Sequence, residues 1–249
     1  MPQTDYDEYP EYLGWELFKQ GKNLEAIDAY TRGLAKRKDC ATYNNRSLAY
    51  WTIGDFDSAM SDLRTSDELS MKDFGRSDYN LNRIGAITWI AGNHLKAAEI
   101  WSDVIRMHSK NEFSKGDAAG DIGCGLHLWF ASCFQEAAEF RKISLQFLRK
   151  KAKTKAIRSF PGPMAGYILG QTHEDAILEA AKYPVPARGF CIGYFYIAMM
   201  AKLKGDDNRF RELLSKAVEY GKARMLEREY YLANHLLSIK ELPLLAQHL

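Results

Sequence analysis

The chain has 249 residues, of which 46% are hydrophobic and 27% charged, a balance typical of globular proteins that bury a large core. Its formal net charge of +2 gives no general attraction to nucleic acid or membranes, and no run of 18 apolar residues predicts a transmembrane helix. The acidic N-terminus, MPQTDYDEYPEY, lacks the basic and apolar regions of a signal peptide, so we expect a cytoplasmic protein.

Proline placement and apolar spacing predict a chain made largely of helices. Proline is absent from residues 11 to 160, as long helical stretches require. Apolar residues at helical spacing, interrupted by glycines, predict helices at 9–20, 23–36, 40–53, 56–69, 77–91, 94–108, 117–131 and 134–157.

Three pairs of these helices repeat one pattern. Each pair has a small residue in its first helix, a glycine seven residues later at the turn, an alanine five residues beyond, and a large apolar residue four residues after that. The three sets are Gly14, Gly21, Ala26 and Tyr30; Ser47, Gly54, Ala59 and Leu63; and Gly85, Gly92, Ala97 and Trp101. This pattern resembles the tetratricopeptide repeat (TPR), a helix-turn-helix unit of about 34 residues that stacks into solenoids.

The rest of the chain carries weaker versions of the same pattern. A degraded repeat spans 115–160, further helical pairs span 164–222 after the break SFPGPMAG, and a capping helix is expected at 224–240. In the degraded repeat the small, turn and close-contact positions hold Gly125, Ser132 and Ala137, with Arg141 in place of the large apolar residue. The next pair matches at Ala198, Gly205 and Ala217 but has Phe210 in place of alanine. The capping helix carries Leu226, Tyr230, Ala233 and Leu237 on one stripe.

The resemblance implies an all-α fold: a right-handed TPR-type superhelix of antiparallel helix pairs with a C-terminal capping helix. It implies one solenoid over 1–249, with three clear repeats in 8–110. Residues 115 to 237 are also similar in pattern to bacterial TPR lipoproteins that act as adaptors for proteases and cell-wall hydrolases. Those lipoproteins need a lipobox cysteine after a signal peptide, whereas no cysteine precedes Cys40. Their envelope location is therefore not implied here.

Catalytic and metal-binding patterns are not found in the sequence. It contains no HExxH, GxSxG, P-loop or GxGxxG. The four cysteines, Cys40, Cys124, Cys133 and Cys191, are widely spaced and have no histidine at zinc-site spacing. The glycine-rich segment 116–125 indicates close helix packing better than a phosphate cradle. We therefore expect no catalytic residue, no metal and no cofactor.

An aromatic residue recurs four positions after the small packing residue of each first helix, as Phe18, Trp51, Trp89 and, in the degraded repeat, Trp129. Together with Trp15, these rings would form a stripe on the concave surface, where partly exposed tryptophans are typical interface anchors. The alternative is that they pack between successive first helices. The sequence leaves both interpretations open.

One type of TPR groove clamps the C-terminal carboxylate of chaperone peptides with Lys and Asn in the first repeat, Asn in the second, and Lys and Arg in the third. Asn45 and Arg83 match this set, but the other positions hold Glu11, Trp15 and Tyr79, and Glu11 would repel a carboxylate. We therefore reject this clamp. Asn44, Asn45, Asn82 and Arg83 remain candidate donors to a peptide backbone. The predicted partner-binding residues are thus Trp15, Phe18, Asn44, Asn45, Trp51, Tyr79, Asn82, Arg83, Trp89 and Trp129.

A run of six cations without an acid forms the basic patch Arg149, Lys150, Lys151, Lys153, Lys155 and Arg158. It fits a surface for an acidic protein segment or nucleic acid, but the favoured interpretation is a solvated helix end whose cations complement the helix dipole. Because the run contains no aromatic residue to stack on bases, nucleic acid is the less favoured partner.

These patterns predict a non-catalytic adaptor that binds a partner protein or peptide in its concave groove. A second hypothesis with the same fold is a cytosolic inhibitor of the immunity type, which neutralises one cognate toxin or enzyme. A third is a regulator that binds nucleic acid or an acidic partner through the basic patch. No membrane is involved in any of them, and the apolar tail 242–249 leaves the oligomeric state open.

Overall fold

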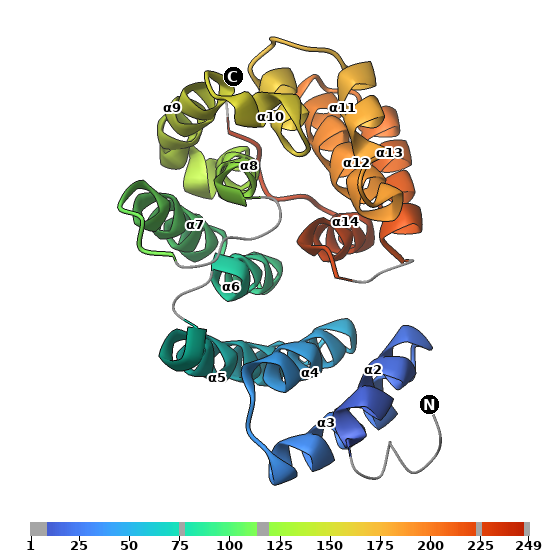
Figure 1. Ribbon diagram of the computed structural model, residues 1–249. Coiled ribbons are helices and arrows are strands. Elements are labelled where there is room, and N and C mark those ends of the chain that lie inside the picture. Colours follow the sequence, from blue (N-terminus) through green and yellow to red (C-terminus); the bar gives the residue numbers. More distant parts are fainter. Residues whose placement is uncertain (1–8, 75–77, 114–119, 223–225, 247–249) are drawn as a thin grey trace. The chain divides into compact units, whose positions relative to one another are not determined.

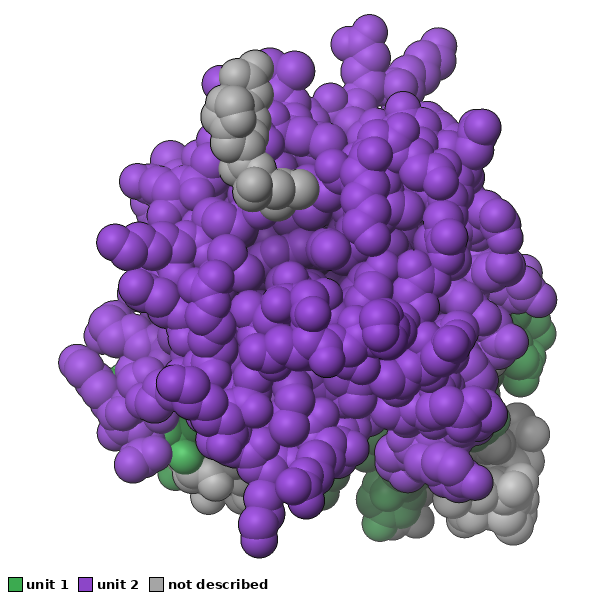
Figure 2. All heavy atoms as spheres, turned by 90° about the horizontal axis from the view of Figure 1, so that it is seen from above, with its two compact units in different colours: residues 1–87, 112–115 green, residues 88–111, 116–249 purple. Residues whose placement is uncertain are grey.

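The computed structural model describes residues 9–74, 78–113, 120–222 and 226–246. Within these ranges every regular element is a helix, apart from one isolated bridge between Phe134 and Leu245 (Figure 1). No helix of the described ranges is both long and apolar enough to cross a membrane. The chain divides into two compact units: unit 1 is residues 1–87 and 112–115, and unit 2 is residues 88–111 and 116–249 (Figure 2).

Unit 1 contains two complete helix pairs and the start of a third. The first pair is α2 (Pro10–Lys19) with α3 (Asn23–Lys36), and the second is α4 (Cys40–Thr52) with α5 (Phe56–Phe74). Helix α6 (Asp78–Ile90) follows, and the boundary between the units falls inside it. We call α2, α4 and α6 the first helices, because each begins one of the three repeats of the sequence pattern.

The repeat pattern is confirmed by the turns and the helix contacts. Gly21, Gly54 and Gly92 have φ values of 76°, 83° and 86°, a left-handed conformation that favours glycine. In the first pair, a Cβ added at Gly14 would lie 2.7 Å from the Tyr30 ring, so only a residue without a side chain fits there. The predicted all-α fold of TPR-type helix pairs is therefore confirmed, while its right-handed superhelical course and single-solenoid organisation stay predictions.

Unit 2 is built around the aromatic side chains of α7 (His94–Ser109), α8 (Gly120–Ser132) and α12 (Pro186–Leu203). Trp101, Phe130 and Phe195 are fully buried there. Helix α12 pairs with α13 (Asp207–Lys222) across Gly205, whose φ is 82°, and this pair packs against α14 (Arg228–Ser238). Two shorter helices, α10 (Gly162–Ile168) and α11 (Glu174–Ala181), precede α12.

The prediction of one continuous helix over 134–157 is wrong. That stretch forms a 3-10 helix, η1 (Gln135–Phe140), then α9 (Arg141–Ala152), then a second 3-10 helix, η2 (Lys155–Arg158). Ala137 has φ −117° and ψ 17°, which interrupts the helix. Because η1 is inserted before α9, the residue that packs on Gly125 is Phe147, whose ring lies 2.6 Å from an added Cβ. Arg141 does not pack there. Its Nη2 donates a hydrogen bond of 2.9 Å to the carbonyl oxygen of Ser132, at the end of α8.

Of the stripe predicted for the last helix, Ala233 alone is buried, and Leu226 lies before the start of α14. Leu226, Tyr230 and Leu237 are only partly buried, whereas Arg228, Glu229, Leu232 and Leu236 are buried. The buried face is rotated by about one residue, because Glu229 is held inside by a hydrogen bond to His127 of α8. An apolar pattern cannot identify a buried charged pair.

Candidate functional site

Two adjoining hollows lie on unit 1, at the first helices. One has a volume of about 350 Å³ and is lined by Glu11, Tyr12, Trp15, Arg37, Asp39, Ala41, Thr42 and Asn45. The other has a volume of about 250 Å³ and is lined by Cys40, Ala41, Asn44, Asn45, Ser66, Ser70, Tyr79 and Asn80. Because both are lined by Ala41 and Asn45, they form one depression across α2, α4 and α6, which we call the first-helix groove.

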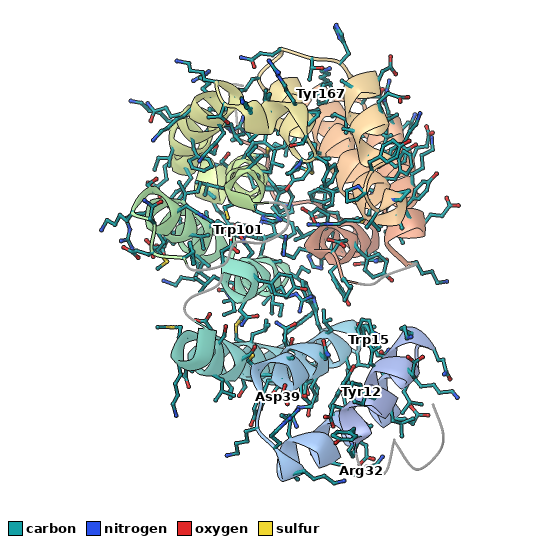
Figure 3. The ribbon with its side chains drawn as sticks, in the orientation of Figure 1. Tyr12, Trp15, Arg32, Asp39, Trp101 and Tyr167 are labelled. Carbon is teal, nitrogen blue, oxygen red and sulfur yellow. The ribbon has the colours of Figure 1, made fainter. Side chains whose placement is uncertain are left out.

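The larger hollow combines aromatic and charged side chains. Tyr12 and Trp15 come from α2 and Asp39 immediately precedes α4 (Figure 3). The Tyr12 side chain is 50% exposed, and the half-buried Trp15 stacks on Phe18 with ring centroids 5.8 Å apart. Asp39 caps α4, accepting hydrogen bonds from the backbone N–H of Thr42 at 2.9 Å and from its hydroxyl at 2.7 Å. This hollow therefore offers ring faces and carboxylates to a ligand.

The smaller hollow has a floor of linked polar side chains. Nη1 of Arg83 donates to Oδ1 of Asn44 at 2.5 Å, and Nδ2 of Asn44 donates to Oδ1 of Asn80 at 2.5 Å. Nδ2 of Asn80 then donates to the Ser66 hydroxyl at 3.1 Å, which donates to the Cys40 carbonyl at 2.8 Å. Because each amide is held by two partners, the floor is fixed before any ligand arrives.

We predict that replacing Asn80 by alanine lowers the free energy of unfolding by about 1–3 kcal/mol, the cost of leaving a buried polar group unsatisfied. Asn80 is 4% exposed, and its loss removes the acceptor of Asn44 and the donor to Ser66. Urea denaturation followed by circular dichroism measures the change. The matched control is Asn45→Ala, on the partly exposed neighbour of Asn44, which we expect to have little effect. Equal losses in the two variants would contradict the prediction.

The structure divides the predicted partner-binding residues into two groups. Trp15, Asn44, Asn45 and Tyr79 line the first-helix groove. The others are buried, with exposures of 0% for Phe18, 4% for Trp51, 1% for Asn82, 0% for Arg83, 0% for Trp89 and 2% for Trp129. Of the two interpretations of the aromatic series, packing is the one that these exposures support. Arg83 and Asn44 bond to each other rather than pointing outward as donors.

Packing is clearest at Trp89, at the C-terminal end of α6. Its ring centroid lies 4.8 Å from those of His94 and Phe130, 5.2 Å from that of Phe134, and 5.7 Å from that of His235. The indole is enclosed on several sides by rings of unit 2. It therefore offers no face to a ligand.

Sequence reasoning missed Tyr12, Asp39 and Asn80 as groove residues. For Tyr12 a signal was present: it stands two residues before Gly14, just as Asn45 stands two residues before Ser47. Equivalent repeat positions lie on the same face of each first helix. The prediction that Asn45 lines the groove therefore implied the same for Tyr12. Asp39 and Asn80 had no such signal, since one lies in a turn and the other looks like an ordinary polar helix residue.

The basic patch lies at the C-terminal end of α9 and on η2. Arg149, Lys150, Lys153, Lys155 and Arg158 are exposed, while Nζ of Lys151 lies 5.4 Å from the centre of the Phe147 ring. Cations in the last turn of a helix complement its dipole. This placement matches the interpretation of the patch as a solvated helix end.

Unit 2 also encloses a cluster of ionisable side chains around His127 of α8. Nε2 of His127 lies 3.1 Å from Oε1 of Glu229, and the Tyr196 hydroxyl lies 3.5 Å from the same oxygen. Nε of Arg228 lies 3.4 Å from the imidazole, on which the Trp101 ring stacks with centroids 5.4 Å apart. His127 is 0% exposed and Glu229 3%. The cluster is sealed inside the core and has no access for a ligand.

The electrostatics of this cluster hold Glu229 ionised. Burial by itself raises the pKa of the Glu229 carboxyl, but the hydrogen bond from His127 and the charges of His127 and Arg228 outweigh it and lower the pKa to about 2. The same carboxylate helps to raise the pKa of the Tyr196 hydroxyl, for which burial is the larger cause. These groups are paired with one another, as buried charges in proteins usually are.

Three solved helical-repeat structures align with this chain at low sequence identity. A tetratricopeptide repeat protein from Parabacteroides merdae aligns at 15% identity and a TM-score of 0.48, over 90% of this chain and 83% of its own. The TPR2AB domain of yeast Sti1, in complex with pHSP90, aligns at 19% identity and a TM-score of 0.40, over 94% and 100%. The C-terminal part of a TPR repeat-containing protein from Cytophaga hutchinsonii aligns at 16% identity and a TM-score of 0.40, over 90% and 88%.

No protein-family model matches the sequence. No curated protein matches it either.

Proposed function

We propose that the chain is a non-catalytic adaptor that binds a segment of a partner protein in the first-helix groove. The observation that carries this proposal is the pair of adjoining hollows that crosses three first helices of unit 1. Most of the lining side chains belong to α2, α4 and α6, and the rest are Ser66 and Ser70 of α5 and Arg37 and Asp39 between α3 and α4. A depression of this form suits a peptide that crosses the helices, with successive side chains in successive hollows.

The groove residues offer different kinds of contact to a bound peptide. Trp15 and Tyr12 supply ring surface, the kind of contact that dominates protein interfaces. Asn45 lines both hollows and makes no hydrogen bond among the described residues, so its amide is available to a peptide backbone. Asn44 and Arg83 serve the floor instead, because they bond to each other. Recognition therefore falls to Tyr12, Trp15, Asn45 and Tyr79.

The test is selection of binding peptides from a phage-displayed library of random peptides on the full chain. We expect Trp15→Ala to weaken the affinity for the selected peptides about tenfold, since a central aromatic anchor contributes about 1–2 kcal/mol or more to binding. Fluorescence anisotropy with the labelled peptides measures the affinities. Leu24→Ala is the matched control, because Leu24 is 68% exposed and belongs to α3 outside the groove. Peptides that bind both variants equally well would place the site elsewhere.

The inhibitor hypothesis uses the same groove and differs in the number and strength of its partners. An inhibitor binds one cognate enzyme tightly, whereas an adaptor binds several proteins more weakly. Purified complexes from the source cells, identified by mass spectrometry and measured by titration, separate the two. Micromolar binding to several proteins would reject the inhibitor.

A further inference from the structure

We propose that the larger hollow of the first-helix groove selects a basic side chain of the bound segment, arginine in preference to lysine. This inference rests on the proposed function, because it names what one hollow of that groove accepts. It follows from three features: the charges of this hollow, its rings, and the absence of a carboxylate from the lining of the hollow beside it.

The charges of the larger hollow are unequal. Two carboxylates, Glu11 and Asp39, line it together with one guanidinium, Arg37. Nη2 of Arg37 lies 3.8 Å from Oε1 of Glu11, beyond hydrogen-bond distance, and the Arg37 side chain is 72% exposed. Because Arg37 is exposed and makes no hydrogen bond to Glu11, this pair is weak, and Arg37 can move away at little cost. A bound cation then meets two carboxylates.

Glu11 is held in place by the packing of α2 on α3. Its side chain is only 18% exposed, and a Cβ added at Gly33 of α3 would lie 3.0 Å from Oε2 of Glu11. Asp39 is fixed by its two hydrogen bonds to Thr42. Both carboxylates are already ordered before binding. Binding a cation therefore costs little side-chain entropy at Glu11 and Asp39.

The rings favour a flat cation. Tyr12 and Trp15 line the same hollow as the two carboxylates, on the side formed by α2 (Figure 3). A guanidinium stacks on an aromatic face and bonds a carboxylate through two parallel N–H groups, whereas an ammonium is a compact, strongly hydrated charge. The hollow therefore prefers arginine to lysine.

The smaller hollow has no carboxylate in its lining, which consists of Cys40, Ala41, Asn44, Asn45, Ser66, Ser70, Tyr79 and Asn80. The charged group in its floor is the buried guanidinium of Arg83, which donates to Asn44. The requirement for positive charge is thus confined to one end of the groove. An acidic side chain or a terminal carboxylate would be repelled at that end by Glu11 and Asp39.

The experiment compares the selected peptides on matched variants of the full chain. The double variant Glu11→Gln with Asp39→Asn removes both charges and keeps the shapes, and asparagine is as good a helix cap as aspartate. We expect the selected peptides to share one arginine position, and its replacement by alanine to weaken binding to the natural chain about tenfold or more. On the double variant, the arginine peptide and its alanine replacement should bind with equal affinity. Glu16→Gln is the control, because Glu16 lies on α2, pairs with Lys19 and does not line the hollow.

The outcomes separate this inference from the proposed function. Peptides that depend on Trp15 but share no basic position, or that keep their arginine dependence on the double variant, would overturn the inference and leave the groove function standing. Peptides that do not depend on Trp15, or no peptides at all, would overturn both. Circular dichroism of each variant confirms that it is folded before binding is measured.

Discussion

Replacing Glu229 by glutamine lowers the free energy of unfolding of unit 2 by about 3 kcal/mol at neutral pH, the lower end of the range for removing one partner of a buried ion pair. The substitution removes the carboxylate charge that bonds to His127 and interacts with the charge of the Arg228 guanidinium. Glutamine has nearly the same shape, so the loss reports charge rather than packing. Urea denaturation followed by circular dichroism measures it.

The stabilisation by Glu229 should depend on pH in a defined direction. The pKa of Glu229 is lowered from its ordinary value of 4.5 to about 2. A lowered carboxyl pKa contributes stability that is fully present above the unfolded value and is lost as the pH falls through the folded value. The stability difference between the natural chain and the Glu229→Gln variant should therefore shrink as the pH falls from about 4.5 to about 2.

The matched control is the same substitution at an exposed ion pair. Glu212 on α13 bonds to Lys216 at 2.6 Å, and its side chain is 63% exposed. Glu212→Gln should leave the free energy of unfolding essentially unchanged, because solvent screens exposed pairs. If Glu229→Gln were as mild as Glu212→Gln, or if its effect did not diminish in acid, the buried cluster would not stabilise unit 2 in this way.

How far the sequence predicts this structure depends on the range of the interactions involved. The helix pairs follow from local chemistry: a glycine at a left-handed turn and a small residue against a large one, as at Gly14 and Tyr30. The insertion of η1 is harder to see, since nothing in QEAAEF forbids an α-helix. The bond between His127 and Glu229 joins positions 102 residues apart and has no local signature.

The candidate site was harder to predict than the fold, for a related reason. Position in a repeat fixes which side of a helix a residue lies on, but the neighbouring helices decide whether that side is covered. One of the two interpretations of the sequence places Trp15 and Trp89 on one concave stripe. Trp15 lines an open hollow, while Trp89 is enclosed by Phe130, Phe134 and two histidines. The two residues also hold different repeat positions: Trp15 follows Gly14 by one residue, whereas Trp89 follows Gly85 by four. Phe18 and Trp51, at that fourth position in unit 1, are buried as well.

Replacing Trp89 by alanine should lower the free energy of unfolding by about 3–5 kcal/mol, the usual cost of removing a large buried aromatic side chain. The indole is 0% exposed and contacts four rings, so its removal leaves a cavity that the surrounding rings cannot fill. Trp89→Phe should cost much less, because it keeps most of the ring and removes an indole N–H that has no hydrogen-bond partner.

Trp89 and Trp15 together form a pair of opposite predictions. Trp89→Ala should destabilise the chain strongly but leave the affinity of the folded protein for the selected peptides unchanged. Trp15→Ala should weaken peptide binding and have little effect on the free energy of unfolding. Binding is measured at low temperature, where both variants are folded. If Trp89→Ala weakened binding as much as Trp15→Ala while remaining folded, the aromatic series would be a ligand surface after all. That result would require the rings around Trp89 to open, because a side chain with no exposed surface cannot contact a partner.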